Sequence, residues 1–282
     1  MIRLVRRIAG TTAVCALGAA LAACGSAQAP PAGHPAPAKP APAAKPPTLP
    51  VGAGGAAPVF TNGPRTLGKT VALTFDADMT ADEGPRAAAG EHFDNPALIA
   101  TLRRLKVPAT VFMTGRWAEQ YPDQARSLGS DPRFEVANHS YSHYAFTGDC
   151  YGLPTVPADG MTSDVQRAYA ALVKAGVPHP MPYFRFPGGC YDRQALRAVG
   201  RLGVTAVQWD VVSGDAFATD ADAVTKQVLD GVKPGSVVVM HCTRSAAPTT
   251  EQVVRDVVPE LRKRGFRFVK VSELIGQTPG HR

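Results

Sequence analysis

The amino-acid sequence predicts an α/β fold, namely an irregular or incomplete (β/α) barrel with about seven parallel strands. From residue 65 onward, short runs of β-branched and aromatic residues alternate with longer amphipathic stretches, which is typical of parallel strands joined by helices. The chain of 282 residues is also long enough to bury one large core. An open doubly wound sheet is the alternative. In both folds, functional residues gather at the carboxyl ends of the strands.

Seven segments have the composition of buried strands, with β-branched and aromatic residues in short apolar runs. Because these runs alternate with helical stretches rather than with tight turns, we expect the strands to be parallel. The expected strands are residues 70–75, 109–113, 134–137, 183–186, 204–209, 237–240 and 266–270.

The stretches between the strands carry the start and stop signals of helices. Asn95, Asp192 and Asp220 each precede an apolar repeat of helical period and are suited to be N-caps. Gly203 ends the second of these repeats. Pro259 lies inside a fourth amphipathic stretch and predicts a kink there. By contrast, residues 81–93 are interpreted as an extended loop.

The first 64 residues predict a leader and a tether. Residues 1–23 combine a basic start, an apolar stretch and a small-residue triplet before Cys24, a pattern that resembles a bacterial lipoprotein signal. Cys24 would then be lipidated, whereas a plain secretory signal with an incidental cysteine is the alternative. Residues 24–64 are rich in Pro, Ala and Gly, which favours an extended tether. Residues 65–282 would form the folded domain, held by the lipid at the outer face of the plasma membrane.

The charge and the cysteine content indicate which partners and which compartment to expect for the protein. The net charge is +7, and about +4 remains without the three leader arginines. No Lys/Arg run interleaved with aromatic residues is present, so we expect no nucleic-acid partner. Cys150, Cys190 and Cys242 remain after the leader, and this odd number suggests one disulfide and one free thiol in an oxidising exterior. We favour a Cys150–Cys190 pair, although the sequence does not fix it.

Polar residues follow the expected strands at their carboxyl ends, where the fold places functional groups. Two of them, His139 and His143, are four residues apart. In a helical turn this spacing would bring both imidazoles to one cation. The whole set consists of Asp76, Asp78, His139, His143, Arg185, Asp210, Asp215 and His241.

Five ordered motifs resemble those of the polysaccharide deacetylases, carbohydrate esterase family 4, over residues 68 to 275. Five ordered motifs at strand ends are far more specific than any one of them. The resemblance implies a (β/α) barrel that hydrolyses acetyl groups with the help of a metal. The motifs are Thr74-Phe75-Asp76, the run from Asn138 to His143, the run from Phe184 to Gly189, the run from Trp209 to Asp215, and Val239-Met240-His241.

The resemblance assigns a base and a metal site. It implies that Asp76 is the general base that takes a proton from the attacking water, and that Arg185 keeps this carboxylate ionised and oriented. His139 and His143 match the metal-binding histidines. The family's adjacent aspartates are here separated by Ala77. The expected third ligand is Asp78, reached by a bulge or an altered turn just past the strand, with a water or Glu83 as the alternative. This ligand set favours Zn²⁺, although Co²⁺, Ni²⁺ or Mn²⁺ would also suit it.

The resemblance also assigns an acid and an oxyanion donor. His241 matches the general acid that protonates the leaving amine, and Asp215 the carboxylate that orients it. The backbone N–H of Gly188 falls where the family stabilises the tetrahedral intermediate. Trp209 and Phe217 are expected at the substrate pocket, the latter because Ala216 stands where the family usually has an aromatic residue.

The resulting expectation is a monomeric, metal-dependent enzyme that deacetylates N-acetylated amino sugars of a glycan polymer. Peptidoglycan is favoured because a lipid anchor would hold the domain beside it. Chitooligosaccharides and acetyl esters of polysaccharides are alternatives. A non-catalytic wall-binding lipoprotein of the same fold is the competing hypothesis, yet pure binding needs no oriented acid and base.

Overall fold

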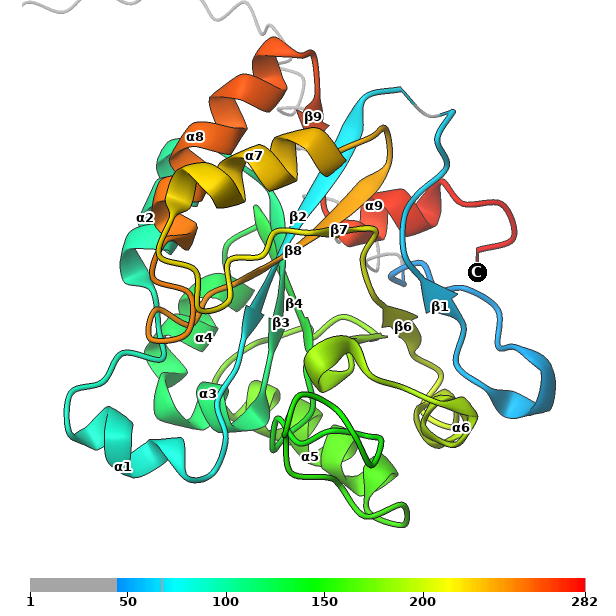
Figure 1. Ribbon diagram of the computed structural model, residues 1–282. Coiled ribbons are helices and arrows are strands. Elements are labelled where there is room, and N and C mark those ends of the chain that lie inside the picture. The colour runs from blue at the N-terminus through cyan, green and yellow to red at the C-terminus, as the bar shows by residue number, and fades with distance from the viewer. Residues whose placement is uncertain (1–44, 67, 282) are drawn as a thin grey trace, which may run out of the picture. The chain divides into compact units, whose positions relative to one another are not determined.

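A curled parallel sheet forms the centre of the fold in the computed structural model, which describes residues 45–66 and 68–281 (Figure 1). The strands follow the spatial order β1-β6-β5-β4-β3-β2-β8-β7, and β9 pairs with β2 outside this path. All pairings between these strands are parallel. β1 and β7 are the two ends of the order, so the sheet is a barrel that does not close. The predicted incomplete (β/α) barrel is confirmed.

All seven predicted strands are present, and two further strands were not predicted. The additional strands β1 and β7 have two residues each, too few to show the period-2 alternation by which a strand is recognised. The strands are β1 Val59–Phe60, β2 Thr70–Ala77, β3 Ala109–Met113, β4 Phe134–Asn138, β5 Tyr183–Phe184, β6 Thr205–Val207, β7 Val211–Val212, β8 Ser236–His241 and β9 Arg267–Phe268.

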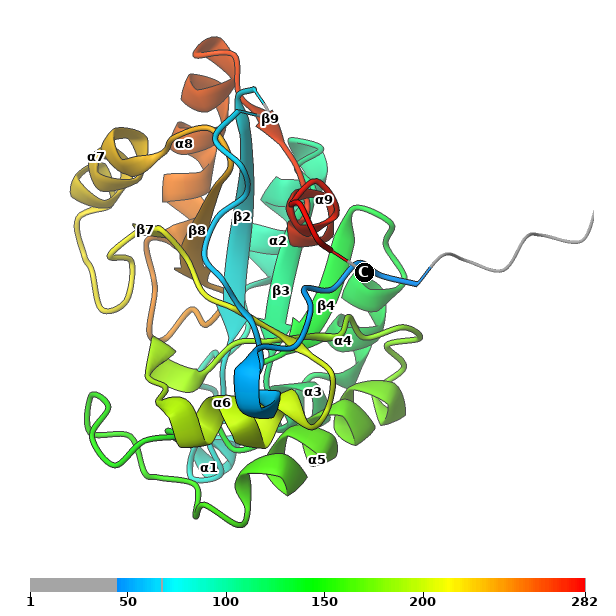
Figure 2. The same cartoon turned by 90° about the vertical axis from the view of Figure 1, so that its right-hand side faces the viewer.

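Helices cover the sheet, and their predicted caps are in place. Asn95, Asp192 and Asp220 accept hydrogen bonds from backbone N–H groups in the first turns of α2, α6 and α7. α8 continues through Pro259, and Figures 1 and 2 show α7 and α8 side by side. The helices are α1 Glu83–Ala88, α2 Pro96–Arg104, α3 Gly115–Gln120, α4 Pro122–Gly129, α5 Met161–Lys174, α6 Arg193–Gly200, α7 Ala221–Gly231, α8 Thr250–Lys263 and α9 Val271–Gly276.

Side chains of the central strand β2 alternate between two environments, as a pleated strand requires. Leu73, Phe75 and Ala77 pack outward into the large core beneath the helices. Thr74 and Asp76 lie on the other side and are also buried, with 0% and 4% of their surface exposed. β2 therefore places the Asp76 carboxylate inside the barrel, while the alternate apolar side chains of the same strand pack against the helices.

Two predictions about chain organisation were wrong. Residues 45–64, expected in the tether, belong to the folded body: β1 pairs with β6, the Leu49 N–H donates to Thr205 Oγ1, and Tyr183 Oη donates to the Pro47 carbonyl. Pro and Ala there pack against the barrel edge, which composition alone does not reveal. Residues 81–93, expected as an extended loop, contain α1, which buries none of its residues.

The predicted signal peptide, Cys24 and the first part of the tether lie outside the described residues. Among the helices within residues 45–281, none combines the length and apolar character needed to cross a bilayer.

Candidate active site

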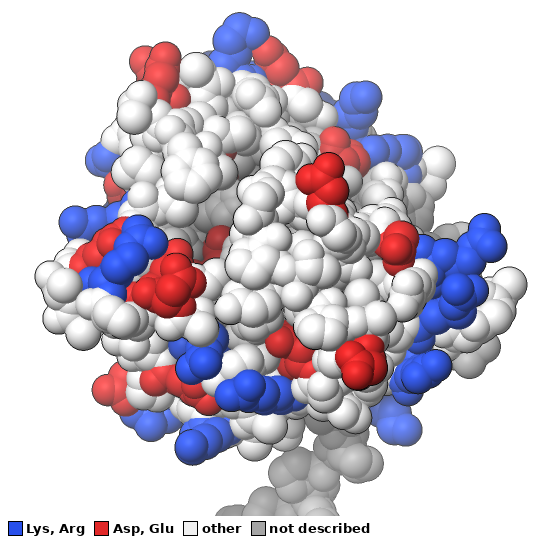
Figure 3. Space-filling view, turned by 60° about the horizontal axis from the view of Figure 1, so that its bottom comes forward, with Lys and Arg blue, Asp and Glu red and all other residues white. Residues whose placement is uncertain are grey.

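The predicted site residues converge at the carboxyl ends of the strands, at the bottom of Figure 1. Asp76 at the end of β2 lies opposite His241 at the end of β8 in the parallel register. His139 follows β4 and Arg185 follows β5. Figure 3 looks onto this face and shows a hollow bordered mostly by uncharged side chains.

Asp76 and Arg185 form a buried ion pair. Arg185 Nη1 lies 2.6 Å from Asp76 Oδ1, and Arg185 Nη2 donates to Thr74 Oγ1 at 2.9 Å. The arginine side chain is 0% exposed, and its guanidinium lies over the ring of Phe112. Burial by itself would raise the pKa of Asp76, but the guanidinium outweighs it, and the pKa lies below its usual value. Asp76 is therefore an ionised base held in one orientation.

His139 and His143 approach one another, although not in the expected helical turn. The segment after β4 is a loop in which Ser140 and His143 have positive φ angles of 69° and 57°. The two imidazole centroids are 5.1 Å apart. His139 Nδ1 lies 2.9 Å from the Arg185 carbonyl oxygen, and Nε2 lies 3.7 Å from Asp76 Oδ2 and makes no hydrogen bond within the described part of the chain. Burial lowers the pKa of each histidine to about 4, so both are neutral at physiological pH and able to coordinate a metal.

Asp78 also joins the site, for a reason that the sequence interpretation missed. A bulge or altered turn was expected to bring it inward, but simple strand alternation is sufficient: Ala77 packs outward, and Asp78 lies on the same side as Asp76. Asp78 Oδ2 is 3.7 Å from His143 Nε2, and Thr243 donates to Asp78 Oδ1 at 2.9 Å. Burial is the main cause of the raised pKa of Asp78. Glu83, the alternative ligand, instead accepts the Thr80 N–H.

The donor set fits a divalent metal in chemistry and approximately in spacing. Among residues 45–66 and 68–281, no three His, Cys, Asp or Glu side chains already stand in the arrangement of a metal site. A zinc ion bound tetrahedrally at about 2.0–2.1 Å separates its ligand atoms by roughly 3.4 Å. Asp78 Oδ2 and His143 Nε2 come within a few tenths of an ångström of that spacing at 3.7 Å. Two neutral imidazoles and a carboxylate are a typical zinc set.

His241 and Asp215 form a second pair on the same face. His241 Nδ1 lies 2.8 Å from Asp215 Oδ1, and the His241 backbone N–H donates to Asp215 Oδ2 at 2.8 Å. Thr250 Oγ1 also donates to this carboxylate. Burial would lower the pKa of His241, but the Asp215 charge and hydrogen bond outweigh it and raise the pKa to about 10. His241 is therefore a protonated acid whose Nε2 is left for a ligand.

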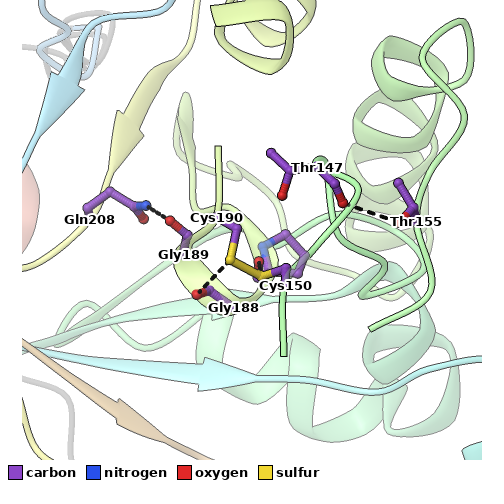
Figure 4. Close-up of a disulfide and its surroundings, with 8 residues drawn as sticks. Thr147, Cys150, Thr155, Gly188, Gly189, Cys190 and Gln208 are labelled. Carbon is purple, nitrogen blue, oxygen red and sulfur yellow. Dashed lines mark hydrogen bonds between the residues drawn. A yellow bond between two sulfur atoms is a disulfide. The ribbon is translucent and has the colours of Figure 1, made fainter. Parts of the chain in front are cut away.

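Gly188 lies beside a disulfide that links two loops of this face (Figure 4). The favoured Cys150–Cys190 pair is confirmed, and Cys242 is the one free cysteine in the described part of the chain and is buried. Gly188 has φ +63°, and a Cβ atom there would lie 2.5 Å from Cys150 Sγ. The loop geometry thus requires glycine.

The two predicted substrate-pocket aromatics have different surroundings. The Trp209 ring packs on Gly189, where a Cβ atom would lie 2.5 Å from the indole, and it also approaches the Arg185 guanidinium. Phe217 is 82% exposed and has a φ angle of 58°. Trp209 is therefore fixed beside the Gly188 loop, whereas Phe217 stands in solvent.

One predicted member of the catalytic face lies elsewhere. Asp210 accepts from the Val237 N–H and from Arg65, so it sits at the amino end of β8, opposite the site. Thr243 and Thr250, which hold Asp78 and Asp215, were not predicted. No sequence pattern marks either residue, because the hydrogen-bond partner of a threonine side chain can be identified only when the fold is known.

The arrangement places a base and an acid at the ends of two adjacent strands, β2 and β8. Asp76 has a lowered pKa and His241 a raised one, which is the pattern expected of a general base and a general acid in one site. The neutral imidazoles of His139 and His143 lie beside Asp76 and Asp78 and are suited to a metal. Such a site can hydrolyse an amide, because water must lose a proton and the poor amine leaving group must gain one.

Comparisons with known proteins agree with this chemistry. The sequence profile of the polysaccharide deacetylases matches residues 63–207. A chitooligosaccharide deacetylase from Azorhizobium caulinodans is 27% identical over 214 residues, which cover 71% of this chain and 96% of that protein. The structure of the Bc1960 peptidoglycan N-acetylglucosamine deacetylase is similar with a TM-score of 0.65 and 25% identity, over 80% of this chain and 96% of that one. A family 4 acetyl xylan esterase from Clostridium thermocellum, solved with a cobalt ion, shares the fold (TM-score 0.59, 22% identity, 74% and 91% coverage).

Proposed function

From the premise that the chain belongs to the polysaccharide deacetylase family, we propose that it removes acetyl groups from the N-acetylated amino sugars of peptidoglycan. The chain is a deacetylase of glycans by its relatives and its fold. One observation carries the proposal most directly: an ionised Asp76 and a protonated His241 end neighbouring strands of the same sheet. That arrangement suits acid–base hydrolysis and has no purpose in a protein that only binds a polymer.

The chain's own residues perform the proton transfers. Asp76 accepts a proton from the attacking water, and Arg185 keeps Asp76 ionised through the contact at 2.6 Å. The Gly188 N–H is assigned to the developing oxyanion. His241 then donates its proton from Nε2 to the leaving amine, while Asp215 holds Nδ1 at 2.8 Å and so fixes which nitrogen faces the substrate.

Members of this family are metal-dependent, and we assign the metal to Asp78, His139 and His143. Zinc is the proposed ion, because two imidazoles and a carboxylate are its usual ligands, and Co²⁺, Ni²⁺ or Mn²⁺ would suit the same donors. When bound, such an ion polarises the acetyl carbonyl and lowers the pKa of water. Thr243 orients Asp78, and the Arg185 carbonyl orients His139.

The assignment to peptidoglycan rests on two supports. The Bc1960 enzyme is by its name a peptidoglycan N-acetylglucosamine deacetylase, and the N-terminal sequence resembles a bacterial lipoprotein signal. We propose that lipidated Cys24 tethers the monomeric enzyme to the outer face of the plasma membrane, within reach of the wall. Chitooligosaccharides are the second candidate, favoured by the Azorhizobium relative.

The substitution Asp76→Asn tests the catalytic assignment. It removes the base but keeps its shape, so acetate release from peptidoglycan should fall by about 10²–10⁴-fold, while binding to the polymer is retained. Asp222→Asn on the exposed surface of α7 is the matched control and should release acetate at the normal rate. Acetate release by the Asp76→Asn variant at the normal rate would refute the assignment, and binding without acetate release in both proteins would favour a wall-binding protein.

A further inference from the structure

A pocket next to the catalytic centre contains two arginines that the deacetylation chemistry does not use. It has a volume of about 350 Å³, and two of its lining residues, Ser142 and Tyr144, flank His143 in the chain. α3 and α5, which pack together at the bottom of Figure 1, supply Arg116, Ser163, Asp164 and Arg167. We call this cavity the Arg116–Arg167 pocket, and its polar lining is Arg116, Tyr141, Ser142, Tyr144, Ser163, Asp164 and Arg167.

Both guanidinium groups are held against one tyrosine. The Arg167 guanidinium carbon is 3.6 Å from the centre of the Tyr141 ring, and Nη2 donates to Tyr141 Oη at 3.0 Å. The Arg116 guanidinium is 5.0 Å from the same ring centre. The tyrosine is almost fully buried, with 3% of its surface exposed. Two guanidinium groups therefore contact one ring, and a further anion bound in the pocket would be attracted by both positive charges.

Both arginines have side-chain N–H groups that make no hydrogen bond to the described residues. Among the described residues, the Arg116 side chain makes no hydrogen bond; its Nε is buried without a partner, and Glu119 approaches Nη1 only to 3.8 Å. Arg167 uses only Nη2. The nearby carboxylates are already engaged: Asp164 accepts the Tyr141 N–H, and Glu119 accepts the Tyr141 hydroxyl. Unused guanidinium donors are suited to bidentate binding of a carboxylate.

We propose that the Arg116–Arg167 pocket is a subsite for a carboxylate on the sugar next to the one that is deacetylated. This inference rests on the proposed function and deepens it. Muramic acid carries a lactyl carboxylate when its peptide is absent, whereas a chitooligosaccharide is uncharged. The pocket thus selects acidic amino-sugar polymers over neutral ones. Figure 3 shows the Lys and Arg side chains of this face interspersed with acidic ones, so the selection is local and does not arise from a broad basic surface.

A matched pair of substrates tests the subsite in the full chain. One is a tetrasaccharide of alternating N-acetylglucosamine and N-acetylmuramic acid with free lactyl groups, and the other is the tetramer of N-acetylglucosamine. The measured quantity is the ratio of kcat/KM for acetate release from the acidic and the neutral substrate. A charge-assisted hydrogen bond contributes enough for about a tenfold effect. The double substitution Arg116→Gln with Arg167→Gln should therefore lower the ratio about tenfold. Because both rates come from one sample, partial loss of folded protein cancels.

The control removes the same charge elsewhere. Arg197→Gln with Arg201→Gln, both exposed and outside the pocket, should leave the ratio at the wild-type value. A ratio that is equal in the pocket variant and in the wild type would overturn the subsite while deacetylation stands. If the wild-type chain releases acetate from neither tetrasaccharide, the proposed function itself fails, and the subsite with it.

Discussion

Replacing Asp215 with Asn should move the alkaline limit of activity to lower pH. Asp215 is the largest cause of the raised pKa of His241, about 10 compared with the ordinary 6.5. At pH 8 a histidine with the raised pKa is almost fully protonated, whereas one returned to about 6.5 is protonated in only about 3% of molecules. If His241 must donate a proton, the variant should lose up to about 30-fold in kcat at pH 8, but less than twofold at pH 6 from this cause.

The assay is acetate release between pH 5.5 and 10 by the wild type and the variant, at saturating substrate. A bound divalent cation lowers the pKa of His241 in both proteins, so the difference between the two profiles is the informative quantity. Asn can still accept the Nδ1 proton, which keeps the ring orientation at the contact that measures 2.8 Å in the wild type. An alkaline limit at the same pH in both proteins would refute the idea that Asp215 keeps His241 protonated.

Three further variants test the residues that support the site. Arg185→Met should lower the free energy of unfolding by about 3–5 kcal/mol in denaturant titrations, because it leaves a carboxylate buried without its partner; a loss below 1 kcal/mol would contradict the burial argument. Replacing Cys150 and Cys190 with Ser opens a link across a sequence separation of 40 residues and should cost up to about 4 kcal/mol of the same quantity, whereas unchanged stability would refute it. Gly188→Ala should lower kcat because its Cβ would lie 2.5 Å from sulfur, whereas Gly148→Ala meets no atom within 4 Å and should not; equal rates in both variants would argue against a fixed Gly188 loop.

Much of the architecture was predictable because each long strand contains several β-branched and aromatic residues in one run. The central strands β2, β3, β4 and β8 were found within one or two residues of their ends, and the caps at Asn95, Asp192 and Asp220 formed as expected. β1 and β7 were missed because two-residue strands exist only through pairing with their neighbours. The Pro/Ala-rich segment 45–64 was assigned to a tether because its composition is unsuited to forming a core by itself. Composition does not show that such a segment can pair with and pack against the edge of a neighbouring sheet.

The candidate site was predictable in its members but less so in its geometry. The rule that functional groups lie at strand ends brought Asp76, His241 and Arg185 to one face, but it also included Asp210, which turns back to the start of β8. The sequence spacing suggested a helical turn between the histidines, whereas the loop reaches the same convergence through positive φ angles at Ser140 and His143. Spacing limits which side chains can meet, but the backbone path between them depends on the surrounding fold.

The most direct test of the central claim is acetate release from peptidoglycan by the full chain, after removal of metal with a chelator and again after adding back zinc. The account predicts release by the untreated enzyme, loss of release after chelation, and recovery with zinc. Undiminished release by fully chelated enzyme, or no release from any N-acetylated glycan with zinc bound, would contradict the proposal that this chain is a metal-dependent deacetylase.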